Sequence, residues 1–478
     1  MSHHTTGTSS GGGDEGGDGG DVLLMPECEA FVQSLKLSTL EELGSPRWAV
    51  QHQHIEKLNM QAIINAQSQA DPYVKEALTL HDKMDVLIEQ LLTVEVWKEK
   101  VFPPLVDKEG FSPQQTFPIV MLLHHEATLI NLLETVLYYR DACECCGESV
   151  LDLLDYCYRK ITTLIARQEA GELNQMFEED HQGTAVTERS NIEEVKFQEN
   201  KVQFDIATKC LSVLRYIIEH RHGLPLSVLA RVLNVHDVPC LLVKLIEESP
   251  WQRRQHGSVL KYIQGRWEAV SAADTYKLTK TEGQIWIAIH HLIMDVDSQR
   301  RYNFSEHSKG IMLRLRAYLP EILLDQLPFL VDLKSFLERM AVSDPSAQPV
   351  MSSSVVIEQL PEIRQCLLER YAGKWSRIAD TQRDKYFDPS PEEMKKMADR
   401  WCETYDFKSL ERLSITDKPR CALCGSDASN RCSKCQMEWY CGRACQVKHW
   451  KKHKPACSLM STHTDTATQA STVTANTA

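Results

Sequence analysis

The sequence predicts a mostly α protein, with an armadillo- or HEAT-like helical solenoid body followed by a small C-terminal domain that binds two zinc ions. Three observations support this prediction. Apolar residues recur at helical spacing through most of the 478-residue chain. Sustained strand alternation is scarce, and only residues 259–270 could form a hairpin. Seven of the 16 cysteines lie within residues 421–457.

The first residues are expected to be a disordered leader outside the fold. Residues 1–22 are rich in Gly, Ser and Asp and contain no apolar stretch that could act as a signal peptide. No downstream apolar run approaches the length of a membrane helix. We therefore expect a cytoplasmic protein that does not bind a membrane. In a reducing compartment, clustered cysteines indicate metal binding rather than disulfides.

Residues 23–408 are expected to form the helical body. Its clearest helix is predicted within residues 115–139, where apolar residues fall on one face: Ile119, Leu122, Leu123, Ile130, Leu133 and Leu137. Similar patterns predict helices at 86–102, 149–166, 204–220 and 238–248. Short amphipathic helices that cannot bury their apolar faces alone favour a solenoid. Because no strict period spans the chain, an irregular helical bundle remains the alternative.

Three polar segments are expected to interrupt or follow the body. Residues 168–200 are rich in glutamate, which predicts a surface insertion between helices. Residues 343–354 are rich in Ser and Pro and are expected to form a linker. Residues 461–478 are rich in Thr, Ala and Ser and are expected to form a disordered tail.

A capped helix is predicted at the end of the body. Ser390 is a suitable N-cap, Pro391 fits the first helical position, and Glu393 would complete a capping box. The buried face would contain Met394, Met397, Ala398, Trp401 and Tyr405. We expect this helix to dock on the body and to lead the chain to the cysteine-rich segment.

The cysteine-rich segment contains four pairs of metal-ligand residues. In chain order they are Cys421 and Cys424, Cys432 and Cys435, Cys441 and Cys445, and His453 and Cys457. Thiolates with one imidazole suit Zn²⁺, and eight ligands fill two tetrahedral sites with none left over, so closed structural sites are predicted. So short a segment cannot bury enough surface to fold unaided. We expect zinc to supply the missing stability.

Other frameworks with clustered cysteines fit this segment less well. A disulfide scaffold is disfavoured because no signal peptide is found. A RING-type ubiquitin-ligase finger would need longer gaps between pairs and a histidine nearer the middle. Residues 418–457 carry a net charge of +7, so the rest of the chain carries −20 of the total of −13. An acidic body disfavours nucleic-acid binding, and the basic segment fits an acidic partner surface or solvation.

The segment resembles the MYND zinc finger through "CSKCQ", "WYCGRACQ" and "HWKKHKPAC". The resemblance implies interleaved ligand pairs. One zinc ion would be held by Cys421, Cys424, Cys441 and Cys445, and the other by Cys432, Cys435, His453 and Cys457. It also implies that the finger binds proline-containing peptides through Ser433, Gln446 and Trp450. Alternatively, Trp450 only packs the small core of the finger, and the two roles can coexist.

No catalytic site is expected in this chain. In "HHE", the neighbouring His124 and His125 point about 100° apart on a helix, whereas a zinc protease needs histidines at i and i+4. We therefore interpret both as structural or surface residues. No phosphate-binding glycine loop or nucleophile elbow is found. A lysine methyltransferase would need strand-rich sequence around the finger, which here follows long helices.

Several body segments extend the resemblance beyond the finger. "HIEKLNMQAIINA", "QTFPIVMLLHHEATLINLLETVLYY" and "RWCETY" resemble a family of zinc finger MYND domain-containing assembly factors, over roughly residues 23–457. The resemblance implies a cytoplasmic adaptor needed to preassemble axonemal dynein arms for motile cilia. It implies chaperones, other assembly factors including a leucine-rich-repeat protein, and axonemal dynein chains as partners, with no nucleic acid.

A nuclear transcriptional corepressor adaptor is the alternative function, because several MYND proteins have this role. The basic run "KHWKKHKPAC" could act as a nuclear signal. Its residues are also needed to build the finger, which weakens that interpretation.

Overall fold

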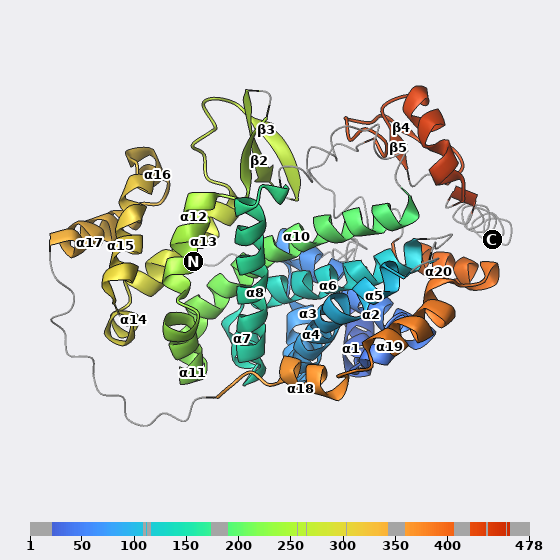
Figure 1. The fold of residues 1–478 in the computed structure, drawn as a ribbon, viewed down its shortest axis with the longest axis horizontal. Coiled ribbons are helices and arrows are strands. Elements are labelled where there is room, and N and C mark those ends of the chain that lie inside the picture. Colours follow the sequence, from blue (N-terminus) through green and yellow to red (C-terminus); the bar gives the residue numbers. More distant parts are fainter. Residues whose placement is uncertain are drawn as a thin grey trace, which may run out of the picture.

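The computed structural model describes residues 22–458 except 109–110, 112–115, 174–189, 256, 264, 303, 343–358, 406–420, 436–437 and 456. The predicted leader, linker and tail at 1–22, 343–354 and 461–478 therefore lie almost wholly outside the described residues. The expected fold class is confirmed, since a mostly α body precedes a small C-terminal domain (Figure 1).

The N-terminal half of the body consists of helices that pack mainly on near neighbours in the chain. Its helices are α1 (Met25–Ser34), α2 (Pro46–Ser68), α3 (Tyr73–Leu80), α4 (Met84–Lys100), α5 (Phe102–Val106), α6 (Phe117–Val136), α7 (Arg140–Glu144), α8 (Ser149–Glu169) and α10 (Asn191–His220). The long helix α6 contacts α2, α4 and α10. It is therefore the central element of this half, and most of its side chains are buried.

The middle of the body continues the stack. Its elements are α11 (Leu226–Ala230), α12 (Val238–Glu248), β1 (Gln252–Gln255), β2 (Ser258–Ile263), β3 (Arg266–Val270), α13 (Lys280–Ile293), α14 (Val296–Arg301), α15 (Glu306–Arg314), α16 (Glu321–Gln326) and α17 (Leu330–Val342). α13 packs on α10 and α12, and α15 packs on α12 and α17. Figure 1 shows α14–α17 at one end of the elongated body.

The three strands form a small antiparallel sheet in the order β1-β2-β3. The hairpin predicted at 259–270 is confirmed, and its strands pair Tyr262 with Trp267. Both rings pack near Phe204 of α10, at centroid distances of 4.8 and 5.9 Å. The first strand was not predicted, because its sequence "QRRQ" is short and entirely polar.

The last helices of the body return to the first ones. They are α18 (Ile363–Arg370), α19 (Trp375–Gln382) and α20 (Pro391–Thr404). α18 packs against α4, α19 against α5, and α20 against α2, so segments far apart in the sequence lie side by side (Figure 1). The capping box of Ser390 and Glu393 and the position of Pro391 are confirmed.

One buried side chain fixes this return. Gln382 is 1% exposed, and its amide oxygen accepts a hydrogen bond from the Trp97 indole nitrogen at 2.7 Å. Its amide nitrogen donates to the carbonyl oxygens of Leu40 (2.9 Å) and Leu43 (3.2 Å). Gln382 thus forms hydrogen bonds with buried polar groups from two other segments of the chain. Left without partners, these buried groups would destabilise the fold.

The predicted surface insertion at 168–200 is wrong at both ends, because residues at each end belong to a helix. α8 continues to Glu169, and α10 begins at Asn191, where Ser190 and Glu193 form a capping box. The first turns of α10 are polar because only a narrow face, including Val195 and Phe197, is buried. The polar composition therefore marked the exposed start of a long helix, and residues 174–189 lie outside the described residues.

By length and composition, α6 could cross a membrane. Two-thirds of its apolar window (67%) is buried within the protein, as in the core helix of a globular fold. It also carries the fully buried Glu126 and His125. Both histidines of the "HHE" run were interpreted as structural or surface residues, and the structure places His125 in the core and His124 on the surface.

Glu126 is the centre of a buried ionic cluster. Its carboxylate lies 2.9 Å from the Lys98 amine of α4 and 2.8 Å from the Lys160 amine of α8, and it accepts a hydrogen bond from Tyr156 at 2.7 Å. Burial opposes ionisation of Glu126, but the ammonium groups of Lys160 and Lys98 hold its pKa well below the usual range. The ionised carboxylate therefore joins three helices.

We expect Glu126→Ala to lower the free energy of unfolding by about 3 to 5 kcal/mol, because two buried ammonium groups lose their nearest counterion. Urea unfolding followed by circular dichroism at 222 nm measures this change. The matched control is Glu144→Gln, which breaks the exposed pair with Arg140 and should cost less than about 1 kcal/mol. Equal effects of the two substitutions would contradict the central role of the cluster.

A pair of buried histidines predicts acid sensitivity. The Nδ1 atoms of His52 and His125 lie 2.8 Å apart beside Trp48. Burial lowers the pKa of His52 to about 3, and burial together with His52 lowers the pKa of His125 well below its usual value. Since both pKa values are lowered on folding, the unfolded chain binds more protons below about pH 6.5. Stability is therefore full above that pH and is lost as the pH falls.

We expect the free energy of unfolding to fall between pH 7.5 and pH 5.5 by about 1 kcal/mol for each buried histidine. Urea unfolding at both pH values measures this slope. His125→Gln should flatten the slope, whereas the exposed His307→Gln should keep it. A His125→Gln protein with the wild-type slope would exclude the pair as its cause.

Candidate zinc centres and peptide surface

The C-terminal domain consists of a cysteine-containing turn, a short hairpin and a helix. Strands β4 (Asn430–Arg431) and β5 (Trp439–Tyr440) pair antiparallel, and a helix covers residues 443–455. Gly425 has φ +69°, which a glycine adopts without strain, and its N–H closes the turn onto the Cys421 carbonyl at 2.9 Å. These elements bring ligands from both ends of the domain together.

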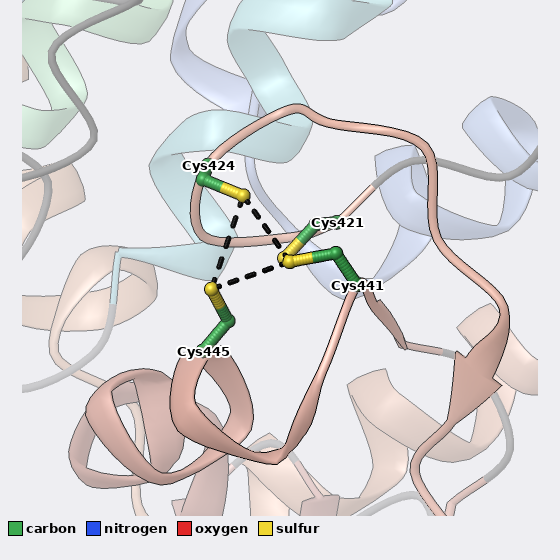
Figure 2. A group of neighbouring side chains, drawn as sticks. All are labelled: Cys421, Cys424, Cys441 and Cys445. Carbon is green, nitrogen blue, oxygen red and sulfur yellow. Dashed lines mark hydrogen bonds between the residues drawn. The ribbon is translucent and has the colours of Figure 1, made fainter.

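The first cluster contains Cys421, Cys424, Cys441 and Cys445. Cys421 and Cys424 come from the turn, Cys441 follows β5, and Cys445 lies in the first turn of the helix. Figure 2 shows their sulfur atoms pointing toward one another. The sulfur of Cys441 lies 3.5 Å from that of Cys424 and 3.4 Å from that of Cys445.

The second cluster contains Cys432, Cys435, His453 and Cys457. The two cysteines follow β4, and the other two ligands come from the far end of the domain. The sulfurs of Cys432 and Cys457 lie 3.7 Å apart, and the Cys435 sulfur lies 3.5 Å from His453 Nε2. All four residues are buried.

These distances fit tetrahedral zinc. With Zn–S near 2.3 Å and Zn–N near 2.05 Å, neighbouring sulfurs lie about 3.8 Å apart and a sulfur and a nitrogen about 3.6 Å apart. In each cluster all four ligand atoms lie within 4.8 Å of one another. The expectation of two zinc ions is therefore confirmed, and the structure groups the ligands in the interleaved pattern. Zinc would cross-link the turn, the hairpin and the helix.

The thiols of the first cluster differ in how readily they ionise. A hydrogen bond with the Ser426 hydroxyl lowers the pKa of Cys424 to about 6, whereas the neighbouring Cys445 sulfur raises the pKa of Cys441 to about 12. Four thiols this close cannot all become thiolates without a cation between them. Zinc binding would therefore release protons from the cluster.

Around the metal ligands the domain has only a small core. Leu423, Ala428 and Tyr440 are buried among the ligand cysteines. The Arg431 guanidinium lies 4.1 Å from the centroid of the Trp439 ring. His449, which falls off the ligand spacing, has its Nδ1 atom 3.0 Å from the Tyr440 hydroxyl. So small a core agrees with the expectation that metal holds the domain together.

The three residues implied in peptide binding lie close to metal ligands in the sequence. Ser433 is exposed in the turn between Cys432 and Cys435, and Gln446 and Trp450 lie one turn apart on the helix. The Trp450 side chain is 37% exposed, and its ring contacts that of His453 at a centroid distance of 5.8 Å. Its ring thus packs on the finger while remaining available to solvent, and peptide binding by these residues stays a prediction.

A helical body with two interleaved zinc clusters at its C-terminal end defines a MYND-containing adaptor protein. Residues 421–457 match the MYND finger family. The chain is 32% identical over 453 residues to "Zinc finger MYND domain-containing protein 10 homolog" of Drosophila melanogaster, covering 90% of this chain and 98% of that protein. The chain therefore belongs to the family of zinc finger MYND domain-containing protein 10.

The similarities to two other proteins are too short to indicate an activity for this chain. Ubiquitin carboxyl-terminal hydrolase 17 of Arabidopsis thaliana is 42% identical over 45 residues, which is 9% of this chain and 6% of that protein. Ubiquitin carboxyl-terminal hydrolase 19 of the same plant is 39% identical over 54 residues, which is 11% of this chain and 8% of that protein. No solved structure matches the chain.

We expect Cys441→Ala to lower the zinc content from two ions per chain and to unfold the finger while the helical body stays folded. Mass spectrometry of the metal and circular dichroism measure the two effects. The control Cys366→Ala removes an exposed cysteine outside both clusters and should keep both ions. Loss of most helical signal in Cys441→Ala would contradict the independence of the body.

Proposed function

We propose that this protein is a non-enzymatic cytoplasmic adaptor in the preassembly of axonemal dynein arms for motile cilia. The proposal rests mainly on one observation, the similarity to a zinc finger MYND domain-containing protein 10 homolog over nearly the full length of both chains. In this proposal the MYND finger binds an assembly partner, such as a leucine-rich-repeat protein. The helical body binds dynein chains or the chaperones that hold them.

The two parts of the chain suit two different partners. The finger is basic and presents Trp450 to solvent, whereas the rest of the chain is acidic. The body is elongated, and a stack of helices offers a long surface to a large partner. Linking two binding modules raises the effective concentration of one partner near the other without any new contact.

Affinity capture from the cytosol of differentiating ciliated cells tests this proposal. We expect the intact protein to recover axonemal dynein chains and chaperones, and Cys441→Ala to lose the partners bound by the finger. Trp450→Ala keeps all eight zinc ligands. If the finger binds peptides through this ring, the recovery of the same finger partners should fall at least ten-fold.

Two outcomes would overturn the proposal. Recovery of chromatin corepressors without any dynein chain would favour the nuclear alternative. A predominantly nuclear signal of the tagged protein in multiciliated cells would do the same.

A further inference from the structure

The helical body contains a large open groove that lies outside the zinc finger. Its volume is about 1810 Å³. Residues along the length of α6, from Phe117 to Thr135, line the groove together with Tyr138 and Tyr139 beyond its end, and residues of α2 and α10 are also in its lining. Further lining residues come from β2, β3, the 271–281 segment and α20. The groove is thus long, and two of the elements that border it, α2 and α10, pack directly on α6.

The middle of the groove holds a pair of side-chain amides. Asn131 of α6 donates to the amide oxygen of Asn59 on α2 at 2.7 Å. Among the described residues, no further hydrogen bond engages the Asn131 oxygen or the Asn59 nitrogen, although Asn59 is only 8% exposed. The pair therefore offers one acceptor and one donor side by side, as a peptide backbone requires.

Aromatic side chains line both ends of the groove. At one end, Trp401 packs edge-on against Phe117 at a centroid distance of 5.3 Å. At the other end, Tyr138 is 59% exposed and packs edge-on against Tyr216 at 5.9 Å. Since α6 rises about 1.5 Å per residue, these ends lie about 30 Å apart. An extended chain of roughly nine or ten residues spans that length.

The charges in the groove compensate one another. The lining contains five carboxylate and five Lys or Arg side chains. Glu134 pairs with Lys209 at 3.0 Å and with Lys280 at 3.6 Å, and Tyr262 donates a hydrogen bond to Asp205. A nucleic acid or an anionic lipid surface needs an excess of positive charge. The groove therefore suits a ligand of low net charge.

We infer that this groove binds an extended polypeptide segment of roughly ten residues and low net charge, whose backbone pairs with the amides of Asn59 and Asn131. Apolar side chains near the two ends of the segment pack on the aromatic residues at the two ends of the groove. The inference rests on the proposed adaptor function in one respect, since it names the part of the body that holds a client or chaperone segment.

A selection from random ten-residue peptides, with blocked termini, against the purified full-length protein tests the inference. Enriched peptides are then measured by fluorescence anisotropy. We expect Ala127→Trp, which fills the groove, and Asn131→Leu, which removes the amide pair, each to weaken binding at least ten-fold. Thr162→Ala, on the exposed face of α8 and outside the groove, should leave the affinity unchanged.

Circular dichroism and zinc content establish that each variant is folded. The inference is overturned if no enriched peptide loses affinity with either folded groove variant. It is also overturned if a ten-nucleotide RNA or phosphatidylserine vesicles bind more tightly than every enriched peptide and Ala127→Trp abolishes that binding. Because the peptide assay uses no cell extract, its failure would leave the adaptor proposal intact. Absence of dynein chains from the captured proteins would refute that proposal without bearing on the groove.

Discussion

The helical body depends on one buried carboxylate. Glu126 lies at the middle of α6 with no exposed surface, between ammonium groups from α4 and α8. An ion in such an environment is tolerated only when its partners are held in place. It therefore specifies how α4, α6 and α8 lie relative to one another, while the apolar faces of these helices supply most of the stability. The shape of the groove depends on the same arrangement of helices, because the face of α6 opposite Glu126 lines the groove.

Local sequence patterns predicted several of the longer helices, because apolar spacing and caps act within a few turns. The helices at α4, α6, α8 and α12 agree with their patterns, and the Ser390 cap starts α20 as expected. The return of α18–α20 to the N-terminal helices was not predicted. Gln382 and Trp97 are 285 residues apart, and neither residue is distinguishable in sequence from an ordinary surface glutamine or core tryptophan.

The zinc clusters could be predicted almost completely, and the groove could not. Zinc requires particular residue types at short spacings, so the ligands are visible in the sequence. The pairing into two interleaved sets came from family resemblance, and the structure brings the same sets together. A groove requires residues from several distant elements. Its one local sign is that Ala127, Asn131 and Thr135 share a face of α6 that the apolar pattern does not fill.

Glu56 lies in the part of the groove that is also lined by Tyr405, the last described residue before the finger. Its buried carboxylate accepts hydrogen bonds from Thr128 of α6 and from the hydroxyl of Tyr405, and all three residues line the groove. Tyr405 is only 16 residues before the start of the finger, at Cys421. Even a fully extended chain of that length reaches about 50 to 60 Å. The contact of Tyr405 with Glu56 therefore keeps the start of the finger within that distance of one end of the groove. In the proposed function, this short connection would raise the concentration of a finger-bound partner near a groove-bound segment.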